Sequence, residues 1–197
     1  RLPMGYFKWG FRLVVLLGLV AFFHYSLPQH DIVRIVDTDV TRMDVGNDAD
    51  GNPITRDVRF IYAKYPDDGE MEYRNEDTGW GFPWFFKFDS ANLANRATDF
   101  KSSADTAEWV IVTHYGWRIP MFDMFPNAIS IGKAEGPDQN LIPWFNIIFL
   151  TVLILGILVI RRIFIIWRKQ HVDPVVDAID QEIDETASWW RKLFRKK

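Results

Sequence analysis

The stretch Ile142 to Ile160 reads IPWFNIIFLTVLILGILVI, and none of its nineteen residues is charged. Four basic residues follow it closely: Arg161, Arg162, Arg168 and Lys169. An apolar run of this length that is closed by arginines is typical of a transmembrane helix whose basic end lies in the cytoplasm. A helix buried in a soluble core is the alternative, but the uncharged length and the paired arginines favour a membrane span.

A second apolar run lies near the other end, where Phe11 to Leu27 reads FRLVVLLGLVAFFHYSL with Arg12 as its one charged residue. As a helix it would cover about 25 Å at ~1.5 Å per residue, close to the thickness of a bilayer core. A cleaved signal peptide is the alternative, but no small-residue cleavage site follows the run. We expect a retained signal anchor that ends at Pro28.

Charge is distributed unevenly along the chain. Residues 1–28 carry a net charge of +3, residues 29–140 carry −9, and residues 141–197 carry +3. The positive-inside rule then places both termini in the cytoplasm and the acidic middle outside it, in the periplasm of a Gram-negative bacterium. We therefore expect a protein of the bacterial inner membrane. The acidic middle argues against nucleic-acid binding.

These features predict four parts. Residues 1–28 form the N-terminal cytoplasmic end and the first transmembrane helix, and residues 29–140 form a periplasmic domain. Residues 141–167 form the second transmembrane helix, and residues 168–197 form a cytoplasmic amphipathic tail. The expected fold class is a membrane protein with two transmembrane helices flanking a small, mostly-β domain of the α+β type, with a C-terminal amphipathic helix.

Alternating apolar residues and turn signals organise the periplasmic domain. They predict strands at Asp31–Val45, Arg56–Tyr65, from Met71, at Glu108–Tyr115 and at Asn127–Lys133, with a short helix that begins at Ser90. The chain is also expected to be extended at residues 84–88, with Trp84, Phe86 and Phe88 facing the core and Phe85 and Lys87 facing away. Three strands, a helix and two strands fit an OB-like barrel. Another five-stranded α+β arrangement would read the same.

Few residue patterns point to chemistry. The chain has no cysteine, which excludes disulfides, thiolate metal sites and a cysteine nucleophile. None of the four histidines has a partner at metal-ligand spacing, and the acidic turn before Pro53 lacks the first ligand of a calcium loop. No nucleophile elbow or phosphate-binding glycine loop is present. We therefore expect no metal, no cofactor and no enzyme activity.

Two aromatic loops are the strongest candidates for an interaction surface. Tyr73 to Phe88 reads YRNEDTGWGFPWFFKF, and Tyr115 to Pro126 has the same aromatic character. A monomer seldom exposes so much apolar surface, so these loops suggest docking onto a membrane surface or a neighbouring subunit. The predicted partner-binding residues are Arg74, Glu76, Asp77, Trp80, Phe82, Phe85, Trp117, Arg118, Met121, Phe122 and Phe125.

The tail from Pro174 carries apolar residues at helical spacing and ends in the sequence WWRKLFRKK. An amphipathic helix with a basic, tryptophan-containing tip favours anionic lipid headgroups. A helix that binds a partner protein is the alternative. The predicted lipid-binding residues are Trp189, Trp190, Arg191, Lys192, Phe194 and Arg195.

The motifs HYSLPQHDIVRIV, YRNEDTGWG, KFDSANL, HYGWR, FPNAISI and LIPWFN together cover nearly the whole chain, from Phe7 to about Asp180. In this combination the chain resembles a family of uncharacterised alphaproteobacterial inner-membrane proteins, a domain of unknown function common among Rhodobacter-like bacteria. The resemblance implies a bacterial origin and this membrane topology. It implies no catalytic residue, because no activity is attached to the family.

Three functions fit these observations. The first is a structural or accessory subunit of a larger inner-membrane complex, respiratory or photosynthetic, whose partners are other inner-membrane subunits and anionic lipid, with no nucleic acid. The second is a membrane-anchored periplasmic module that binds a small ligand. The third is a carboxylate-dependent hydrolase built on Glu76, Asp77 and Asp89. The aromatic loops and the absence of a catalytic motif favour the first.

Overall fold

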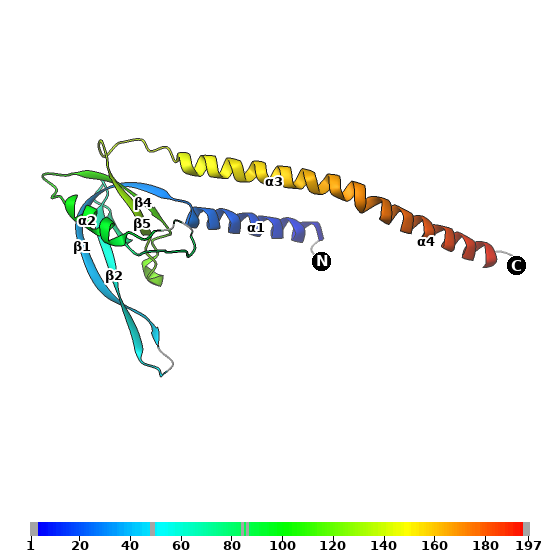
Figure 1. Cartoon of the computed structure of the whole chain (residues 1–197), viewed down its shortest axis with the longest axis horizontal. Coiled ribbons are helices and arrows are strands. Elements are labelled where there is room, and N and C mark those ends of the chain that lie inside the picture. The colour runs from blue at the N-terminus through cyan, green and yellow to red at the C-terminus, as the bar shows by residue number, and fades with distance from the viewer. Residues whose placement is uncertain (1–3, 48–49, 84, 86, 195–197) are drawn as a thin grey trace. The chain divides into compact units, whose positions relative to one another are not determined.

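The computed structural model describes residues 4–47, 50–83, 85 and 87–194. The chain divides into two compact units, Arg1–Pro143 and Trp144–Lys197. Figure 1 shows that the first unit contains all the strands, together with helices α1 (Met4–Ser26) and α2 (Ser90–Asp99). The second unit consists of helices α3 (Trp144–His171) and α4 (Asp173–Phe194).

Five strands form one sheet that closes into a barrel in the order β1-β2-β3-β5-β4. Their bounds are β1 Gln29–Asn47, β2 Pro53–Lys64, β3 Glu70–Arg74, β4 Trp109–Tyr115 and β5 Asn127–Lys133. All neighbours are antiparallel except β3 and β5, which meet in parallel at the single pair Arg74 and Asn127. The predicted order of three strands, a helix and two strands is confirmed, with α2 between β3 and β4.

The core follows from the alternation of side chains along β1 and β4. Val33 and Ile35 of β1 and Val110 and Val112 of β4 are completely buried. The apolar stripe of α2 joins them in one cluster with residues of β2, β3 and β5. Burial of this apolar surface is the main favourable term that holds the barrel together, at roughly 25 cal/mol per Å².

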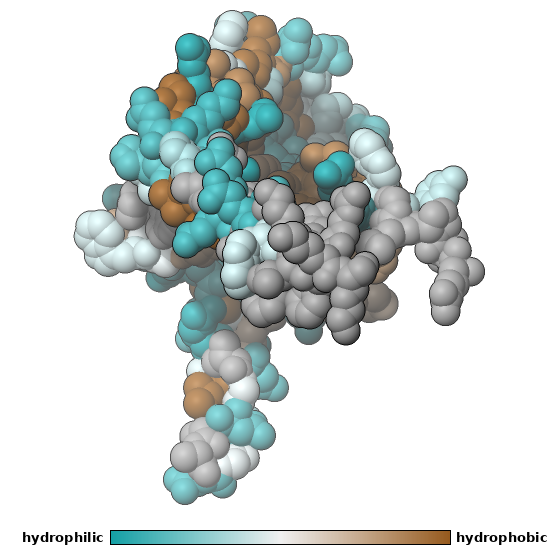
Figure 2. All heavy atoms as spheres, turned by 90° about the vertical axis from the view of Figure 1, so that its right-hand side faces the viewer, coloured by the Kyte–Doolittle hydropathy of each residue, from teal (hydrophilic) through white to brown (hydrophobic). Residues whose placement is uncertain are grey.

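Strands β1 and β2 extend beyond the barrel as a two-stranded ribbon. Only the first part of β1, Gln29–Arg34, pairs with β4, whereas its pairing with β2 continues as far as Asn47 and Pro53. Two irregularities in register, near Ile35 and Asp44, accompany the bend of the ribbon that is visible in Figure 1. Most described residues of the ribbon beyond the barrel are exposed, and Figure 2 shows hydrophilic residues on the visible face, so this part contributes little to the core.

Two helical segments are long and apolar enough to cross a membrane by length and composition, Tyr6–Ser26 and Trp144–Glu185. No residue in the apolar window of either segment is buried within the described protein. The first helix ends one residue after Tyr25, and Pro28 follows it as expected. The membrane topology inferred from the basic flanks stays a prediction.

The expectation for residues 84–88 was wrong in the part that the structure describes. Residues 85, 87 and 88 belong to no strand, Phe88 is 57% exposed, and Lys87 is only 3% exposed. The reason is polar: the Lys87 ammonium reaches two buried oxygen acceptors, a contact that alternation alone does not reveal. Trp84 and Phe86 lie outside the described residues.

The first prediction tests the core. Replacing Ile35, which is fully buried, by alanine should destabilise the barrel by about 2–5 kcal/mol, because it leaves a cavity as well as losing apolar burial. The matched control is Ile54→Ala on the ribbon, where the side chain is 47% exposed. We expect the control to change stability by less than about 1 kcal/mol. Denaturant unfolding of the full chain in mild detergent measures both, and equal effects would contradict this account of the core.

Candidate functional site

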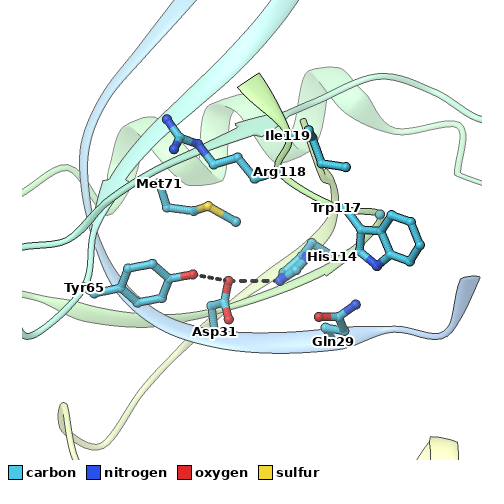
Figure 3. Close-up of a pocket in the computed structure, with 9 residues that line it drawn as sticks. Gln29, Asp31, Tyr65, Met71, His114, Trp117, Arg118 and Ile119 are labelled. Carbon is cyan, nitrogen blue, oxygen red and sulfur yellow. Dashed lines mark hydrogen bonds and ion pairs between the residues drawn. The ribbon is translucent and has the colours of Figure 1, made fainter. Parts of the chain in front are cut away.

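The start of strand β1 places a carboxylate at one end of the barrel interior. Asp31 precedes Val33 and Ile35 on the inward face of the strand. Its Oδ2 accepts hydrogen bonds from the hydroxyls of Tyr65 at 2.8 Å and Tyr73 at 2.7 Å. Nε2 of His114 lies 2.9 Å from the same oxygen. Figure 3 shows the tyrosine and the histidine approaching the carboxylate from opposite sides.

The environment keeps this carboxyl group charged and the phenols neutral. Burial by itself would raise the pKa of Asp31, but the contacts with His114 and Tyr73 outweigh it and the pKa is lowered. Burial, reinforced by the Asp31 charge, raises the pKa of both Tyr65 and Tyr73. An ionised carboxylate is thus stabilised by neutral hydroxyl donors.

Some polar atoms of this cluster have few partners among the residues that the structure describes. Both ring nitrogens of His114 are buried without a well-formed hydrogen bond to them, although Nε2 lies 2.9 Å from Oδ2 of Asp31. Oδ2 of Asp31 takes all the contacts described above, and Oδ1 accepts no hydrogen bond from the described residues. The side chain of Asp31 keeps 22% of its surface exposed. Buried polar atoms without a partner are uncommon, and such atoms often mark a site for water or a ligand.

The cluster opens into a pocket of about 410 Å³. Its lining comes from the start of β1, from β3, from the end of β4 and from the segments that follow β2 and β4: Gln29, Asp31, Tyr65, Met71, His114, Gly116, Trp117, Arg118 and Ile119. This volume lies within the roughly 300–1,000 Å³ typical of small-molecule sites, and the lining combines apolar walls with a few polar groups.

The rim of the pocket is attached to the end of α1. Nε1 of Trp117 donates a hydrogen bond to Nδ1 of His24 at 2.8 Å, and the indole packs edge-on against Tyr25 at a centroid distance of 5.5 Å. The backbone N–H of Gly116 donates to the carbonyl of Tyr25 at 2.9 Å. The pocket therefore lies at the end of the barrel from which α1 departs.

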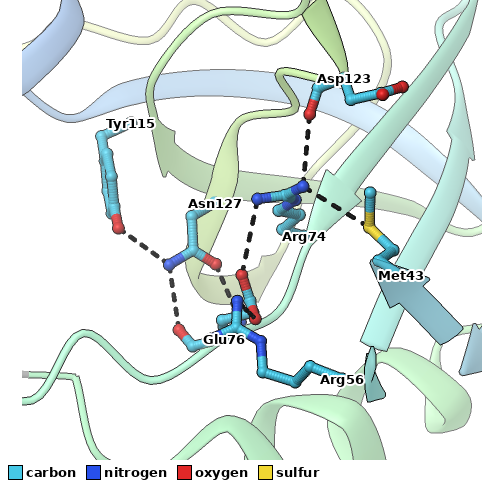
Figure 4. A network of polar contacts seen from close by, with 7 residues as sticks. All are labelled: Met43, Arg56, Arg74, Glu76, Tyr115, Asp123 and Asn127. Carbon is cyan, nitrogen blue, oxygen red and sulfur yellow. Dashed lines mark hydrogen bonds and ion pairs between the residues drawn. The ribbon is translucent and has the colours of Figure 1, made fainter. Parts of the chain in front are cut away.

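A second polar network surrounds Glu76 at the seam where β3 meets β5 (Figure 4). The carboxylate lies 2.6 Å from Arg56 and 3.7 Å from Arg74. Asn127 exchanges two hydrogen bonds with the Glu76 backbone and donates a third to the hydroxyl of Tyr115. These contacts close the barrel where the strand pairing is thinnest.

Asp77 and Lys87 hold the connection between β3 and α2. Asp77 accepts hydrogen bonds from the backbone N–H and the hydroxyl of Ser90, so it caps α2 from outside the helix. The Lys87 ammonium donates to Asn75 Oδ1 and to the Ala128 carbonyl, both at 2.7 Å. Glu76 and Asp77 thus have separate protein partners, and both support the connection between β3 and α2.

The structure brings part of the predicted interaction surface to the end of α1. Phe82 stacks on Phe22 of that helix at 5.5 Å, and Trp117 packs against it as described above. Phe85 stacks on Tyr115, and Phe125 packs edge-on against Phe60, so both have partners within the barrel. The most exposed members of the predicted set are Trp80 at 80%, Met121 at 81% and Phe122 at 64%.

The predicted lipid-binding tip of the tail is described only in part. Trp189 is 57% exposed on α4. The other predicted residues fall outside what the structure describes, either in their side chains or entirely: Trp190, Arg191, Lys192, Phe194 and Arg195.

Sequence reasoning missed the cluster of Asp31, Tyr65, Tyr73 and His114. One signal was present, because alternation places Asp31 in phase with buried valine and isoleucine on β1, and His114 in phase with buried valines on β4. A charged residue in phase with a core stripe indicates a buried polar site. Which strands meet around such a site depends on how the barrel closes, and alternation along single strands does not show this.

The chain belongs to the family described as "Protein of unknown function (DUF1523)", which it matches over residues 4–168. It is also 37% identical over 172 residues to an uncharacterized protein of Haemophilus influenzae, a match that covers 81% of this chain and 96% of the relative. No solved structure matches the chain.

The expectation of an unknown-function family is therefore confirmed. The restriction to alphaproteobacteria is not supported, since Haemophilus is a gammaproteobacterium.

The second prediction concerns Lys87. Burial lowers the pKa of its ammonium to about 8, against the opposing charges of Asp77, Asp89 and Glu76, while the unfolded chain keeps the ordinary value of 10.5. Between these values the unfolded chain binds more protons, so the stability of the wild type should rise with pH. We expect a gain on the order of 1–2 kcal/mol between pH 8 and 9.5.

The variant Lys87→Met should lack this rise, whereas the control Lys133→Met, at a side chain that is 72% exposed, should keep it. Denaturant unfolding of the full chain across this pH range, monitored by tryptophan fluorescence, provides the comparison. A parallel pH profile for the wild type and Lys87→Met would show that the buried amine does not titrate in this window.

Proposed function

We propose that this chain is a membrane-anchored extracytoplasmic binding module, in which an OB-like barrel holds a small ligand beside the end of its first membrane helix. The observation that carries the proposal is the pocket around Asp31 and His114, whose lining combines these two polar side chains with aromatic and aliphatic ones. A pocket of this volume with convergent polar groups is a natural place for a small ligand.

The attachment of the pocket rim to α1 supports a site close to the membrane surface. Trp117 and Phe82 contact the last turns of α1, and that helix is apolar and unburied. Aromatic side chains at the end of a span are typical of the interface between the lipid tails and water. In the proposed topology, a ligand enters the barrel from the headgroup region or from the periplasm next to it.

The third prediction is a ligand screen by thermal unfolding of the full chain in mild detergent. A ligand at about 100 times its dissociation constant stabilises a protein by about 2.7 kcal/mol, which raises the midpoint by about 5 °C or more for a chain of this size. We expect at least one small polar compound to do so. The variant Ile119→Trp, which fills the pocket, should abolish the shift.

The matched control is Val40→Trp on the exposed ribbon, which should respond to the same compound as the wild type does. Equal stabilisation of the wild type and Ile119→Trp by every active compound would place binding elsewhere. A screen of polar metabolites and lipid headgroups without any stabilising compound would count against a binding module.

A second candidate function is an accessory subunit of a larger inner-membrane assembly. The observation that favours it is the exposure of Trp80, Met121 and Phe122, because large apolar side chains on a loop surface are typical of protein interfaces. The tail would then bind anionic lipid or a neighbouring subunit through its basic tip. The hydrolase hypothesis is less favoured, since Glu76 and Asp77 are engaged by Arg56 and Ser90.

The fourth prediction separates the two functions. As an accessory subunit, the chain should co-purify from native membranes with a stoichiometric partner in mild detergent. The double variant Trp80→Ser/Met121→Ser should lose that partner while the folded barrel persists. A binding module instead purifies alone and responds to ligand in the screen described above.

A further inference from the structure

We propose that the pocket recognises a zwitterionic ligand that carries an ammonium group and an anionic group a few ångströms apart, such as phosphoethanolamine. This inference rests on the proposed function, and it assigns one charged group of the pocket to each end of the ligand. The ammonium lies at Asp31, and the phosphate lies at Arg118.

The geometry of Asp31 favours a cation. Its Oδ2 is already occupied by two hydroxyl donors and His114, while Oδ1 accepts nothing from the described residues. A carboxylate that presents one free oxygen in a partly buried pocket gains most from a charged N–H donor, because such hydrogen bonds are roughly twice as strong as neutral ones. The indole of Trp117 in the same lining offers a face for cation–π attraction.

His114 fixes the side of the carboxylate that a ligand can use. Its side chain is only 4% exposed, and its Nε2 lies 2.9 Å from Oδ2 of Asp31. The protein itself therefore fills the contacts of Oδ2, and the ligand ammonium meets Asp31 at Oδ1.

Arg118 supplies the complementary charge. Figure 3 shows its guanidinium across the pocket from Asp31, with Met71 between them. The described chain gives it one ion pair, at 3.3 Å from Glu72, and its side chain remains 31% exposed. A guanidinium has five donors in a planar fork, so most of them remain available for phosphate or carboxylate oxygens. Two opposite charges separated by an apolar wall match a zwitterion better than a simple cation or anion.

Titration calorimetry of the full chain in mild detergent tests this pairing with three probes. Phosphoethanolamine carries both groups, ethyl phosphate lacks the ammonium, and ethanolamine lacks the phosphate. We expect phosphoethanolamine to bind at least about tenfold more tightly than either fragment. In Asp31→Asn, phosphoethanolamine should bind little more tightly than ethyl phosphate. In Arg118→Gln, phosphoethanolamine should bind little more tightly than ethanolamine.

The controls are Asp57→Asn and Arg42→Gln, which break an exposed ion pair on the ribbon and should leave all three affinities unchanged. If Asp31→Asn does not fold, the comparison of the three probes on the wild type still decides the question. Ethyl phosphate or ethanolamine binding as tightly as phosphoethanolamine would overturn the proposal.

The ligand could be a lipid headgroup or a free compound, and reconstitution of the full chain in nanodiscs distinguishes these two sources. Retention of phosphatidylethanolamine by the wild type and its loss in Arg118→Gln, seen by native mass spectrometry, identify a membrane lipid. Binding of phosphoethanolamine without lipid retention identifies a free compound. If the screen finds a pocket ligand that lacks an ammonium group, the proposal of a zwitterionic ligand is overturned but the proposed binding function stands. If the screen finds no ligand, both proposals are overturned.

Discussion

A carboxylate inside the mouth of a barrel has to be satisfied by its neighbours, and Asp31 obtains its contacts from three other parts of the sheet. Tyr65 follows β2, Tyr73 lies on β3 and His114 lies on β4, and all three meet one oxygen atom. Burying a charge is costly unless it is paired and hydrogen-bonded, so these contacts tie the strands to one register. Because all three contacts go to Oδ2, the other carboxylate oxygen of Asp31, Oδ1, remains available to a ligand.

Lys87 is a second buried charge, and its structural role is near the contact between β3 and β5. The Lys87 ammonium lies between Asn75 and the backbone of Ala128. Asp77 caps α2, and Glu76 forms ion pairs with Arg56 and Arg74 where β3 meets β5. The thin parallel contact between β3 and β5 is thereby reinforced by side chains. Two of the three carboxylates of the hydrolase hypothesis thus have structural roles, Glu76 at the seam and Asp77 at the start of α2.

The aromatic residues divide into three groups with different roles. Phe85 and Phe125 pack onto the barrel, Phe82 and Trp117 contact the end of α1, and Trp80, Met121 and Phe122 stay largely exposed. The contacts with α1 hold the pocket rim beside an apolar helix. In the proposed membrane-anchored arrangement, this brings the pocket within reach of lipid headgroups.

The sequence alone predicted the two apolar helices, the order of strands and helix, and the bounds of β5, because hydrophobic length and alternation are local properties of the chain. It did not predict that Phe88 would be exposed and Lys87 buried, since that depended on acceptors at Asn75 and Ala128, distant in the chain. The pocket was decided by tertiary structure in the same way. Asp31, Tyr65, Tyr73 and His114 are spread over more than eighty residues, and only barrel closure brings their polar atoms to one point.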